Sequence, residues 1–477
     1  METFTDVLLV TANVGSLFDN VGKIQSEWLQ ELYKTVHSYK PQFIALHFQE
    51  VGGKDYTANM DHAENFFMSI KSSDEMKEYD RFRIYVDNQF QAEDSFTALG
   101  SMYFIHRTLK NINQYDFTVK DFRTVMGQNV HLGYLDGVST VEKEKFPKHF
   151  WPDFKWSRKG FMRTRWIIHD QGLDLVNVHL FHDASNLIAC ESSPSIYSAN
   201  RRNALRYVIN RVSGSCYTPL PFFLFGDFNF RLDTLSLVQH LSTSADVQTV
   251  TKHSSNEVEK IICEEKDNDH QVLLQIEEKL FAYLHQAVFR EDNGRALLKY
   301  DKEVAVFHDV IREEDIKFPP SYPYSEDYTK PTQYMNTRCP AWCDRILMSH
   351  SAQEFIHRRE GERRVVYNTM GPTVCMGDHK PVFLGGSQCV RVITVISLHS
   401  LESHNPGWPS GVYNHTIHCT PPQCQDQRVI STIASTTHLS FSCRTRLTLA
   451  YTMNTSSWYH WCVTSVPTPT YGPSQLK

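Results

Sequence analysis

A carboxylate and a carboxamide stand two residues apart at the end of an apolar run. Residues 222–225 are apolar, Gly226 follows, and Asp227 and Asn229 come next. If the run is a β-strand, alternate side chains lie on one face, so Asp227 and Asn229 point together from its end. Such a pair suits the activation of water, because the carboxylate accepts a proton while the amide orients the water. The pattern is common where a strand runs into a turn, so the residues alone favour that interpretation and leave the catalytic one open.

Two further segments place acidic, basic and imidazole groups close together. Residues 338–347 read RCPAWCDRIL, and residues 377–381 read GDHKP. With FGDFNFR at 225–231, they resemble the two signature motifs of the inositol polyphosphate 5-phosphatases, within the exonuclease–endonuclease–phosphatase superfamily. The ten-residue motif is very specific, whereas the Gly-Asp-Phe-Asn pattern is shared with related nucleases. The resemblance extends from about Val7 to Leu384 and is most similar to the type I enzymes, which act on soluble inositol phosphates.

The resemblance implies a role for each residue that matches the family's motifs. The implied catalytic residues are Asn13, His179, Asp227, Asn229, Asp344 and His379. Asp227 is expected to take a proton from a water molecule oriented by Asn229, and the water then attacks phosphorus in line. Asp344 is expected to hold His379 as an imidazolium that stabilises charge on the phosphoryl oxygens, together with His179.

The resemblance also implies a divalent metal beside these residues. Glu50, after the apolar run 43–48, is the expected ligand, and Asp378 is a second carboxylate on the metal or water side. The expected ion is Mg²⁺, which takes one or two carboxylates and completes its shell with water and phosphate oxygen. Without the resemblance, Glu50 is more typical of a solvated strand end, His179 of a core histidine and Asn13 of a turn residue.

A phosphorylated substrate carries several negative charges, so its recognition requires cations. The candidates for substrate binding are Lys159, Arg163, Arg165, Arg338, Arg345 and Lys380. Arg345 and Lys380 adjoin catalytic residues within the motifs, and Lys159 resembles the lysine of the family's Asn-Lys-Gly element. Arg163 and Arg165 alternate along an expected strand, where a solvated basic edge is the other interpretation.

Composition limits the classes to which the chain can belong. Its 477 residues are 41% hydrophobic, enough for a large core, and a net charge of −6 disfavours a general nucleic-acid binder. Eleven scattered cysteines are consistent with reduced thiols in a cytoplasmic protein. The sequence shows no signal peptide and no apolar run of membrane-spanning length. We expect a cytoplasmic monomer that binds small inositol phosphates and no nucleic acid.

Apolar runs and helical periodicity alternate along the chain. Residues 6–12 and 43–48 have the composition of buried strands, whereas residues 24–39 and 195–212 are predicted helices. Residues 233–302 are highly charged and are expected to be mostly helical. Strands mixed with helices without a strict repeat favour two stacked mixed sheets flanked by helices. This is the four-layer α/β sandwich, DNase I-like, that the resemblance implies for a catalytic domain at residues 1–386, with the candidate residues at one rim.

The last part of the chain departs from the family pattern. Residues 387–477 carry only five Lys or Arg and two Asp or Glu residues, and their apolar fragments show no sustained period. We expect a disordered or poorly packed tail. Type I members are membrane-associated through a prenylated C-terminal Cys-a-a-X box, which this sequence lacks, so membrane association of this form is not expected.

Three other functions share part of this pattern. An endonuclease of the same superfamily would use Asn13, Glu50, Asp227, Asn229 and His379, but it needs a basic, duplex-sized face. A non-catalytic phosphoinositide-binding protein would keep the basic residues and lose the acid–base ones. A 5-phosphatase acting on membrane phosphoinositides is the nearest alternative. We favour Mg²⁺-dependent hydrolysis of the 5-phosphate of inositol 1,4,5-trisphosphate and 1,3,4,5-tetrakisphosphate, which would end calcium signalling.

Overall fold

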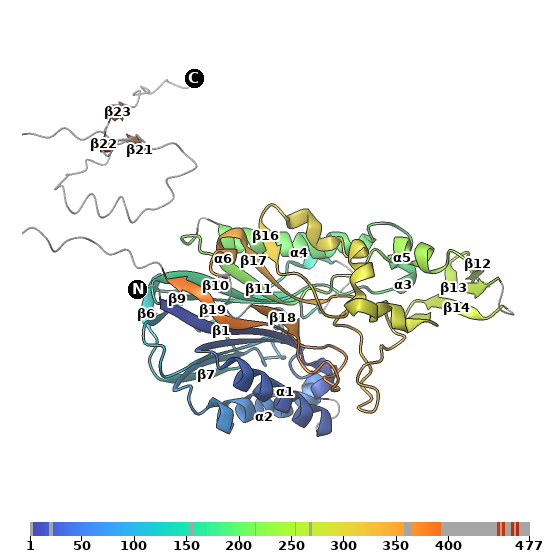
Figure 1. Cartoon of the computed structure of the whole chain (residues 1–477), viewed down its shortest axis with the longest axis horizontal. Helices are drawn as coiled ribbons and strands as arrows, with labels where there is room; N and C mark the ends of the chain where they lie inside the picture. The colour runs from blue at the N-terminus through green and yellow to red at the C-terminus, as the bar shows by residue number, and fades with distance from the viewer. Residues whose placement is uncertain are drawn as a thin grey trace, which may run out of the picture. The chain divides into compact units, whose positions relative to one another are not determined.

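Two stacked β-sheets with helices on their outer sides form the larger of two structural units (Figure 1). The computed structural model describes residues 3–18, 22–151, 157–214, 216–252, 254–266, 270–356 and 365–392, and four short strands within residues 446–466. The chain divides into one compact unit at residues 1–395 and a second at 396–477. The order helices, sheet, sheet, helices within the first unit confirms the expected four-layer α/β sandwich.

The first sheet is mixed and has the strand order β18-β19-β1-β2-β4-β3-β7. Its strands are β1 Thr3–Asn13, β2 Phe43–Gln49, β3 Arg81–Val86, β4 Gly100–Ile105, β7 Gln128–Leu132, β18 Val366–Thr369 and β19 Val382–Val392. Helices α1 (Lys23–Tyr39) and α2 (Tyr56–Ser72) cover its outer face (Figure 1). As the helical periodicity predicted, α1 buries one stripe of side chains at four-residue spacing: Ile24, Trp28, Leu32 and Val36.

The second sheet has the order β16-β17-β11-β10-β9-β5-β6, and β8 pairs with β9. Its strands are β5 Ile112–Asp116, β6 Asp121–Thr124, β8 Glu142–Lys145, β9 Gly160–Ile168, β10 Gln171–His179, β11 Phe222–Asp227, β16 Ile311–Glu313 and β17 Asp344–Ser349. Helices α4 (Ile196–Ser213) and α6 (His350–Gln353) lie on its outer side, and α3 (Asn186–Ala189) precedes α4 (Figure 1).

The two sheets pack through a core of aromatic and branched apolar side chains. His47 of β2 stacks on Phe225 of β11 with ring centroids 3.6 Å apart. Gly226 approaches β10 so closely that an added Cβ would lie 1.8 Å from the Val178 carbonyl oxygen. Only glycine fits there, which explains why the apolar run of β11 is interrupted just before the strand ends.

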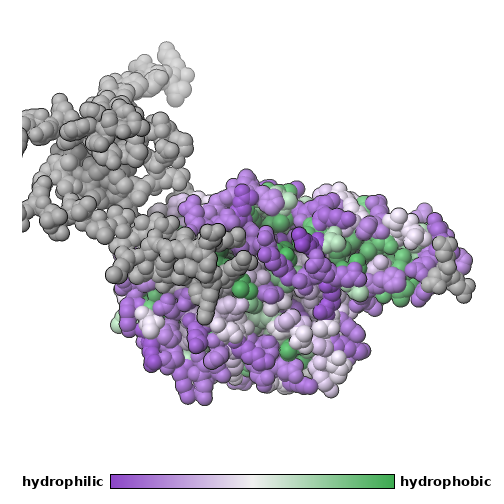
Figure 2. Space-filling view, viewed as in Figure 1, coloured by the Kyte–Doolittle hydropathy of each residue, from purple (hydrophilic) through white to green (hydrophobic). Residues whose placement is uncertain are grey.

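The expectation that residues 233–302 are mostly helical is wrong. Among its described residues, only those at the start of this region form an α-helix, and most of the others form an antiparallel sheet followed by 3₁₀ turns. The elements are α5 Thr234–Leu241, β12 Ala245–Thr251, β13 Val258–Glu265, β14 Val272–Glu277, β15 Leu280–Tyr283, and the 3₁₀ segments η4 Gln286–Phe289 and η5 Glu291–Tyr300. β-Branched residues favour strands here, and the charged residues between them occupy exposed strand positions. Apolar side chains such as Val247 and Val272 remain exposed, and Figure 2 shows apolar surface over this lobe.

The last strand of the first unit extends beyond the catalytic-domain boundary that the sequence suggested. β19 pairs antiparallel with β1 from Val382 opposite Thr11 to Val392 opposite Thr3, so residue 386 lies inside the strand. Most of the tail at 387–477 lies outside the described residues. Its described parts are the strands β20 Arg446–Thr448, β21 Tyr451–Met453, β22 Tyr459–Trp461 and β23 Thr464–Val466. Within the described part of the chain, no helix has the length and apolarity needed to span a membrane.

Candidate active site

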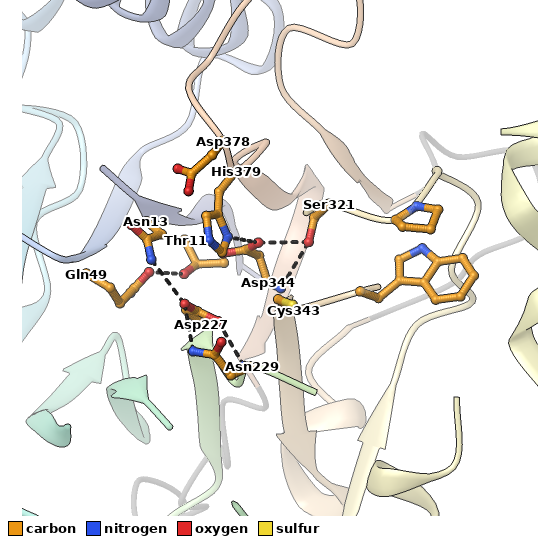
Figure 3. Close-up of polar contacts among 12 residues, drawn as sticks. Thr11, Asn13, Gln49, Asp227, Asn229, Ser321, Cys343, Asp344, Asp378 and His379 are labelled. Carbon is orange, nitrogen blue, oxygen red and sulfur yellow. Dashed lines mark hydrogen bonds and ion pairs between the residues drawn. The ribbon is translucent and has the colours of Figure 1, made fainter. Parts of the chain in front are cut away.

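Several strand ends meet at one rim of the sandwich. Asn13 ends β1, His179 ends β10 and Asp227 ends β11. Asp344 begins β17 and lies directly opposite Asp227 in the ladder. His379 enters from the loop that precedes β19. Segments far apart in the sequence therefore bring these predicted residues together, and Figure 3 shows Asn13, Asp227, Asp344 and His379 among them.

Asp227 is the centre of this cluster and is almost completely buried. Its Oδ2 accepts hydrogen bonds from Asn13 Nδ2 at 3.1 Å and Asn229 Nδ2 at 3.0 Å (Figure 3). His179 Nε2 lies 3.3 Å from the same oxygen. Its Oδ1 accepts from the Asn229 backbone N–H at 2.8 Å. Burial would raise the pKa of Asp227, but the hydrogen bond from His179 and the charges of His379 and Lys159 hold the pKa far below its usual range. Asp227 is therefore ionised.

Asn229 occupies the left-handed backbone region with φ of 51°, which turns its amide back toward β11. Besides Asp227, its Nδ2 donates to the Leu180 carbonyl at 3.1 Å. Its Oδ1 accepts from Arg231 Nη2 at 2.7 Å. Both the nitrogen and the oxygen of the Asn229 side-chain amide are therefore hydrogen-bonded to protein groups. The amide fixes the Asp227 carboxylate in place of binding water directly.

Glu50 follows β2, and its carboxylate faces two basic side chains. Its Oε1 lies 3.6 Å from His179 Nε2 and 3.7 Å from Lys159 Nζ, and the Lys159 and His179 nitrogens also lie against each other. Burial would raise the pKa of Glu50, but the charges of Lys159, Arg158 and His179 lower it to about 2. Burial lowers the pKa of Lys159 to about 8, and it also lowers that of His179. The group therefore combines an ionised carboxylate with a cationic ammonium and a neutral imidazole at neutral pH.

Asp344 and His379 form the ion pair that the resemblance implied. His379 Nδ1 lies 2.8 Å from Asp344 Oδ2, which also accepts a hydrogen bond of 2.7 Å from Ser321 (Figure 3). Burial would lower the pKa of His379, but the charge and hydrogen bond of Asp344 raise it to about 10. The Tyr322 ring packs against the imidazole with centroids 4.4 Å apart. His379 is consequently an imidazolium whose Nε2–H remains for another acceptor.

Asp378 makes different contacts from its neighbour His379. The Ser16 hydroxyl lies 2.5 Å from Asp378 Oδ1 and 2.9 Å from Glu326 Oε1. Burial and the nearby charges of Glu50 and Glu326 raise the pKa of Asp378, against the opposing influence of His379. Asp378 is near Glu50, but its carboxylate accepts a hydrogen bond from Ser16 in this structure.

Comparisons with known proteins show the family to which the chain belongs. Residues 18–385 match the profile of the endonuclease/exonuclease/phosphatase family 2. Human inositol polyphosphate-5-phosphatase A is 57% identical over 381 residues, which cover 80% of this chain and 92% of the human protein. The chain belongs to the inositol polyphosphate 5-phosphatases.

Two more distant proteins are similar to this 5-phosphatase. A probable type I inositol 1,4,5-trisphosphate 5-phosphatase from Caenorhabditis elegans is 36% identical over 413 residues, covering 79% of this chain and 98% of the relative. The 5-phosphatase domain of SPsynaptojanin, solved with inositol (1,4)-bisphosphate and calcium, covers 82% of this chain and 86% of that chain, with 13% identity and a TM-score of 0.41. As the motifs predicted, the protein is a phosphoric monoester hydrolase.

Four of the cations predicted to bind substrate are engaged elsewhere in the 5-phosphatase. Arg345 lies on the opposite face of β17 from Asp344, because side chains alternate along a strand, and it pairs with Glu313 and Asp301 at 2.5 and 2.9 Å. Lys380 donates to the Gly371 carbonyl at 2.9 Å and to that of Val374.

Arg163 and Arg165 share one buried carboxylate, that of Asp174 on the neighbouring strand, at 2.6 and 2.7 Å. Both guanidinium groups are almost completely buried. The contacts of these two arginines, like those of Arg345 and Lys380, indicate a structural role in place of the predicted substrate contact.

Arg231 is a candidate that the sequence reasoning missed. It lies beside Asn229, and its guanidinium stacks over the Tyr322 ring at 4.8 Å. Its buried Nε and Nη1 have no partner among the residues that the structure describes. Arg338 is half-buried nearby, and the charge of Arg231 contributes to lowering its pKa after the larger effect of burial. The signal was present, because residues 227, 229 and 231 alternate within one motif. Arg231, Arg338 and Lys159 are therefore candidate phosphate-binding cations of this site.

The donor chemistry around Glu50 fits a hard divalent cation. Among the described residues, Asp227, Asp344 and His379 place one potential ligand atom each within 4.8 Å of one another. An imidazolium has no lone pair for a metal, so this trio is an ion-pair network. Glu50 is ionised and its side chain is 27% exposed, as a ligand that shares its ion with water and phosphate should be. Glu50 is therefore the residue that fits the expected metal.

Proposed function

We propose that this 5-phosphatase removes the 5-phosphate of soluble inositol 1,4,5-trisphosphate and 1,3,4,5-tetrakisphosphate with Mg²⁺ as cofactor, and so ends calcium signalling. The observation that carries the proposal is the meeting of ionised Asp227, cationic Lys159 and the Asp344–His379 pair at one rim. The names of the relatives support the substrate class, since the Caenorhabditis elegans protein is named for inositol 1,4,5-trisphosphate.

Asp227 is the group that accepts the proton of the attacking water. Its low pKa keeps the carboxylate ionised throughout the neutral range, so it is always available as a hydrogen-bond acceptor. Asn13 and Asn229 hold both of its oxygens in place. Their role in this mechanism is to fix the direction from which water approaches phosphorus.

Three nitrogen donors stabilise the charge that develops on the phosphoryl oxygens. The His379 imidazolium directs its Nε2–H away from Asp344, and Lys159 supplies an ammonium. His179 is neutral and contributes a hydrogen bond rather than a charge. Because these groups are buried and held in place, little reorganisation is needed during the reaction.

Glu50 would hold the divalent ion, and the chemistry that Mg²⁺ supplies there is neutralisation of the phosphate and of the departing alkoxide. Phosphates away from the reacting bond meet Arg231 and Arg338. Two Arg231 nitrogens, Nε and Nη1, have no partner among the described residues, so each N–H can donate to a phosphate oxygen.

Phosphate release with Mg²⁺ tests the proposal directly. The substrates are inositol 1,4,5-trisphosphate, the tetrakisphosphate, the matching phosphoinositide in vesicles, and duplex DNA with an abasic site. Asp227→Asn removes the charge of the buried carboxylate, and Asp315→Asn is the matched control, since that side chain is 86% exposed on the surface.

Release from the soluble substrates that is lost in Asp227→Asn and kept in Asp315→Asn supports the proposal. Turnover of the vesicle lipid with higher kcat/KM than the trisphosphate would assign the enzyme to membrane phosphoinositides instead. Cleavage of the abasic DNA without phosphate release would show an endonuclease.

A further inference from the structure

The segment that carries Glu50 adopts an unusual backbone conformation. Glu50 itself has φ of 56°, and the glycines that follow, Gly52 and Gly53, have φ of 88° and 72°. Glycine adopts this left-handed region without strain, but glutamate does not, so surrounding contacts must hold it there. Functional sites are the common location of such strained residues.

Hydrogen bonds hold this segment on two sides. The Val51 N–H donates to the Ala98 carbonyl at 3.0 Å, and the Gly53 N–H donates to the Glu50 carbonyl at 2.9 Å. The Gly53 carbonyl accepts a hydrogen bond of 2.9 Å from Arg158 Nη1. Arg158 thus contacts the turn that directly follows Glu50.

Arg158 makes a second contact with the same segment. Its guanidinium lies over the ring of Tyr56, the first residue of α2, 5.0 Å from the centroid. The next residue, Lys159, is the one whose ammonium faces Glu50 at 3.7 Å. Arg158 therefore contacts the backbone of this segment, and the next residue, Lys159, contacts its Glu50 carboxylate.

We propose that Arg158 is a positioning residue for the metal ligand Glu50. By holding Gly53 and Tyr56 together, it keeps the turn in the conformation that aims the Glu50 carboxylate into the site. Only arginine can do this, because a planar guanidinium can donate from its edge and stack on an aromatic ring simultaneously. The inference rests on the proposed function in one respect, namely that Glu50 binds the divalent ion.

The charge of Arg158 and its contacts have opposite effects on metal affinity, and this makes the role testable. A positive charge near the site repels a cation, so charge removal alone strengthens metal binding. Loss of the contacts misaligns Glu50 and weakens metal binding. Arg158→Lys keeps the charge and loses the planar group, whereas Arg158→Met loses both.

The experiment measures Mg²⁺ binding to the full chain by isothermal titration calorimetry without substrate. We expect Arg158→Lys to weaken Mg²⁺ binding by about tenfold, which is typical for loss of a partner that orients a ligand. Tyr56→Leu should weaken it similarly, and Tyr56→Phe, which keeps the ring, should not. In turnover assays the Mg²⁺ requirement should rise while kcat at saturating Mg²⁺ changes by less than about twofold.

Arg81→Met is the matched control, because Arg81 also donates to backbone carbonyls, those of His106 and Leu109, away from Glu50. Its Mg²⁺ affinity should equal that of the unchanged protein. Thermal unfolding of every variant separates misalignment from loss of fold.

Unchanged Mg²⁺ affinity in Arg158→Lys, which keeps the charge and loses only the contacts, would overturn the positioning role. A rise in the KM for substrate alone would mean that Arg158 contacts phosphate instead. Failure of the proposed function gives a different result: Glu50→Gln would then bind Mg²⁺ as well as the unchanged protein does.

Discussion

Asn13 of the first sheet donates a hydrogen bond of 3.1 Å to Asp227 of the second sheet, across 214 positions of sequence. The contact joins the two sheets at the rim where the candidate catalytic groups meet. The hydrogen bond also restricts rotation of the Asp227 carboxylate, which is proposed to accept the proton of water. The stability of the sandwich and the geometry of the reaction are therefore coupled at this point.

The first prediction concerns this hydrogen bond. Asn13→Ala should lower kcat by about ten- to a hundredfold, because a hydrogen bond to a charged group contributes about 1.5–3 kcal/mol. The KM for inositol 1,4,5-trisphosphate should change little. Thr11→Val is the control, since it removes a hydrogen bond of the same strand, to Gln49, that does not reach Asp227. Equal kcat values for the two variants would contradict the coupling.

The second prediction is a pH dependence set by Lys159, whose pKa burial lowers to about 8. The ammonium is charged below this pKa and loses its charge as the pH rises through it. The kcat/KM for the trisphosphate should therefore fall above pH 8, by about tenfold per pH unit. His379 is not the cause, because its pKa is raised to about 10.

Lys159→Arg provides the test of that assignment, because a guanidinium keeps its charge throughout the accessible pH range. In a pH series of kcat/KM, the alkaline limb near pH 8 should disappear from this variant. If the limb stays where it was, another group titrates there and the role of Lys159 as the phosphate-facing cation fails.

The third prediction concerns the charge of Asp344. Asp344→Asn keeps a hydrogen-bond acceptor beside His379 but removes the negative charge that raises the imidazole pKa. Burial then dominates and His379 becomes neutral at physiological pH. We expect kcat to fall by about two to four orders of magnitude. The His379 ring resonances in NMR spectra should titrate below neutrality in the variant, and retention of full activity would exclude the imidazolium mechanism.

Much of this site followed from local sequence rules, and its departures from prediction have physical causes. Strand ends after apolar runs correctly placed Asn13, His179 and Asp227 at one rim. The parallel strands β10 and β11 end at the same edge, and Asn13 at the end of β1 meets Asp227 across the two sheets. The role of Arg345 depended on which face of β17 it occupies. Strand alternation relative to Asp344 already implied the opposite face.

Other contacts depended on information that is absent from local sequence. Asp174 lies opposite Arg165 only because of the register between β9 and β10, which the chain fixes through the packing of both strands. The sheet of residues 245–283 was missed because charged residues are common on exposed helices and on exposed strands alike. The left-handed conformation of Glu50 likewise arises from contacts with Ala98 and the turn at Gly53.

The fourth prediction separates structural from substrate-binding arginines. Arg345→Met leaves the carboxylates of Asp301 and Glu313 buried without their cation, which should cost about 3–5 kcal/mol in the free energy of unfolding. Urea denaturation measures this loss, and kcat of the remaining folded protein should be unchanged. Arg231→Met should behave in the opposite way, with a higher KM and a smaller loss of stability. A substrate-binding defect in Arg345→Met at full stability would restore the role first predicted for it.

The fifth prediction concerns where the catalytic domain ends. Val390, Arg391 and Val392 of β19 pair with the first residues of β1, so the strand continues past residue 386. A protein that ends after Gly386 loses these partners, and it should be less stable by about 2–4 kcal/mol, at roughly 1 kcal/mol for each lost backbone hydrogen bond. A protein that ends after Val395 keeps the whole ladder and should match the full chain in urea denaturation and in kcat. If both truncated proteins unfold at the same urea concentration, the backbone pairs of residues 390–392 with β1 contribute nothing to stability. The stable domain would then end at residue 386.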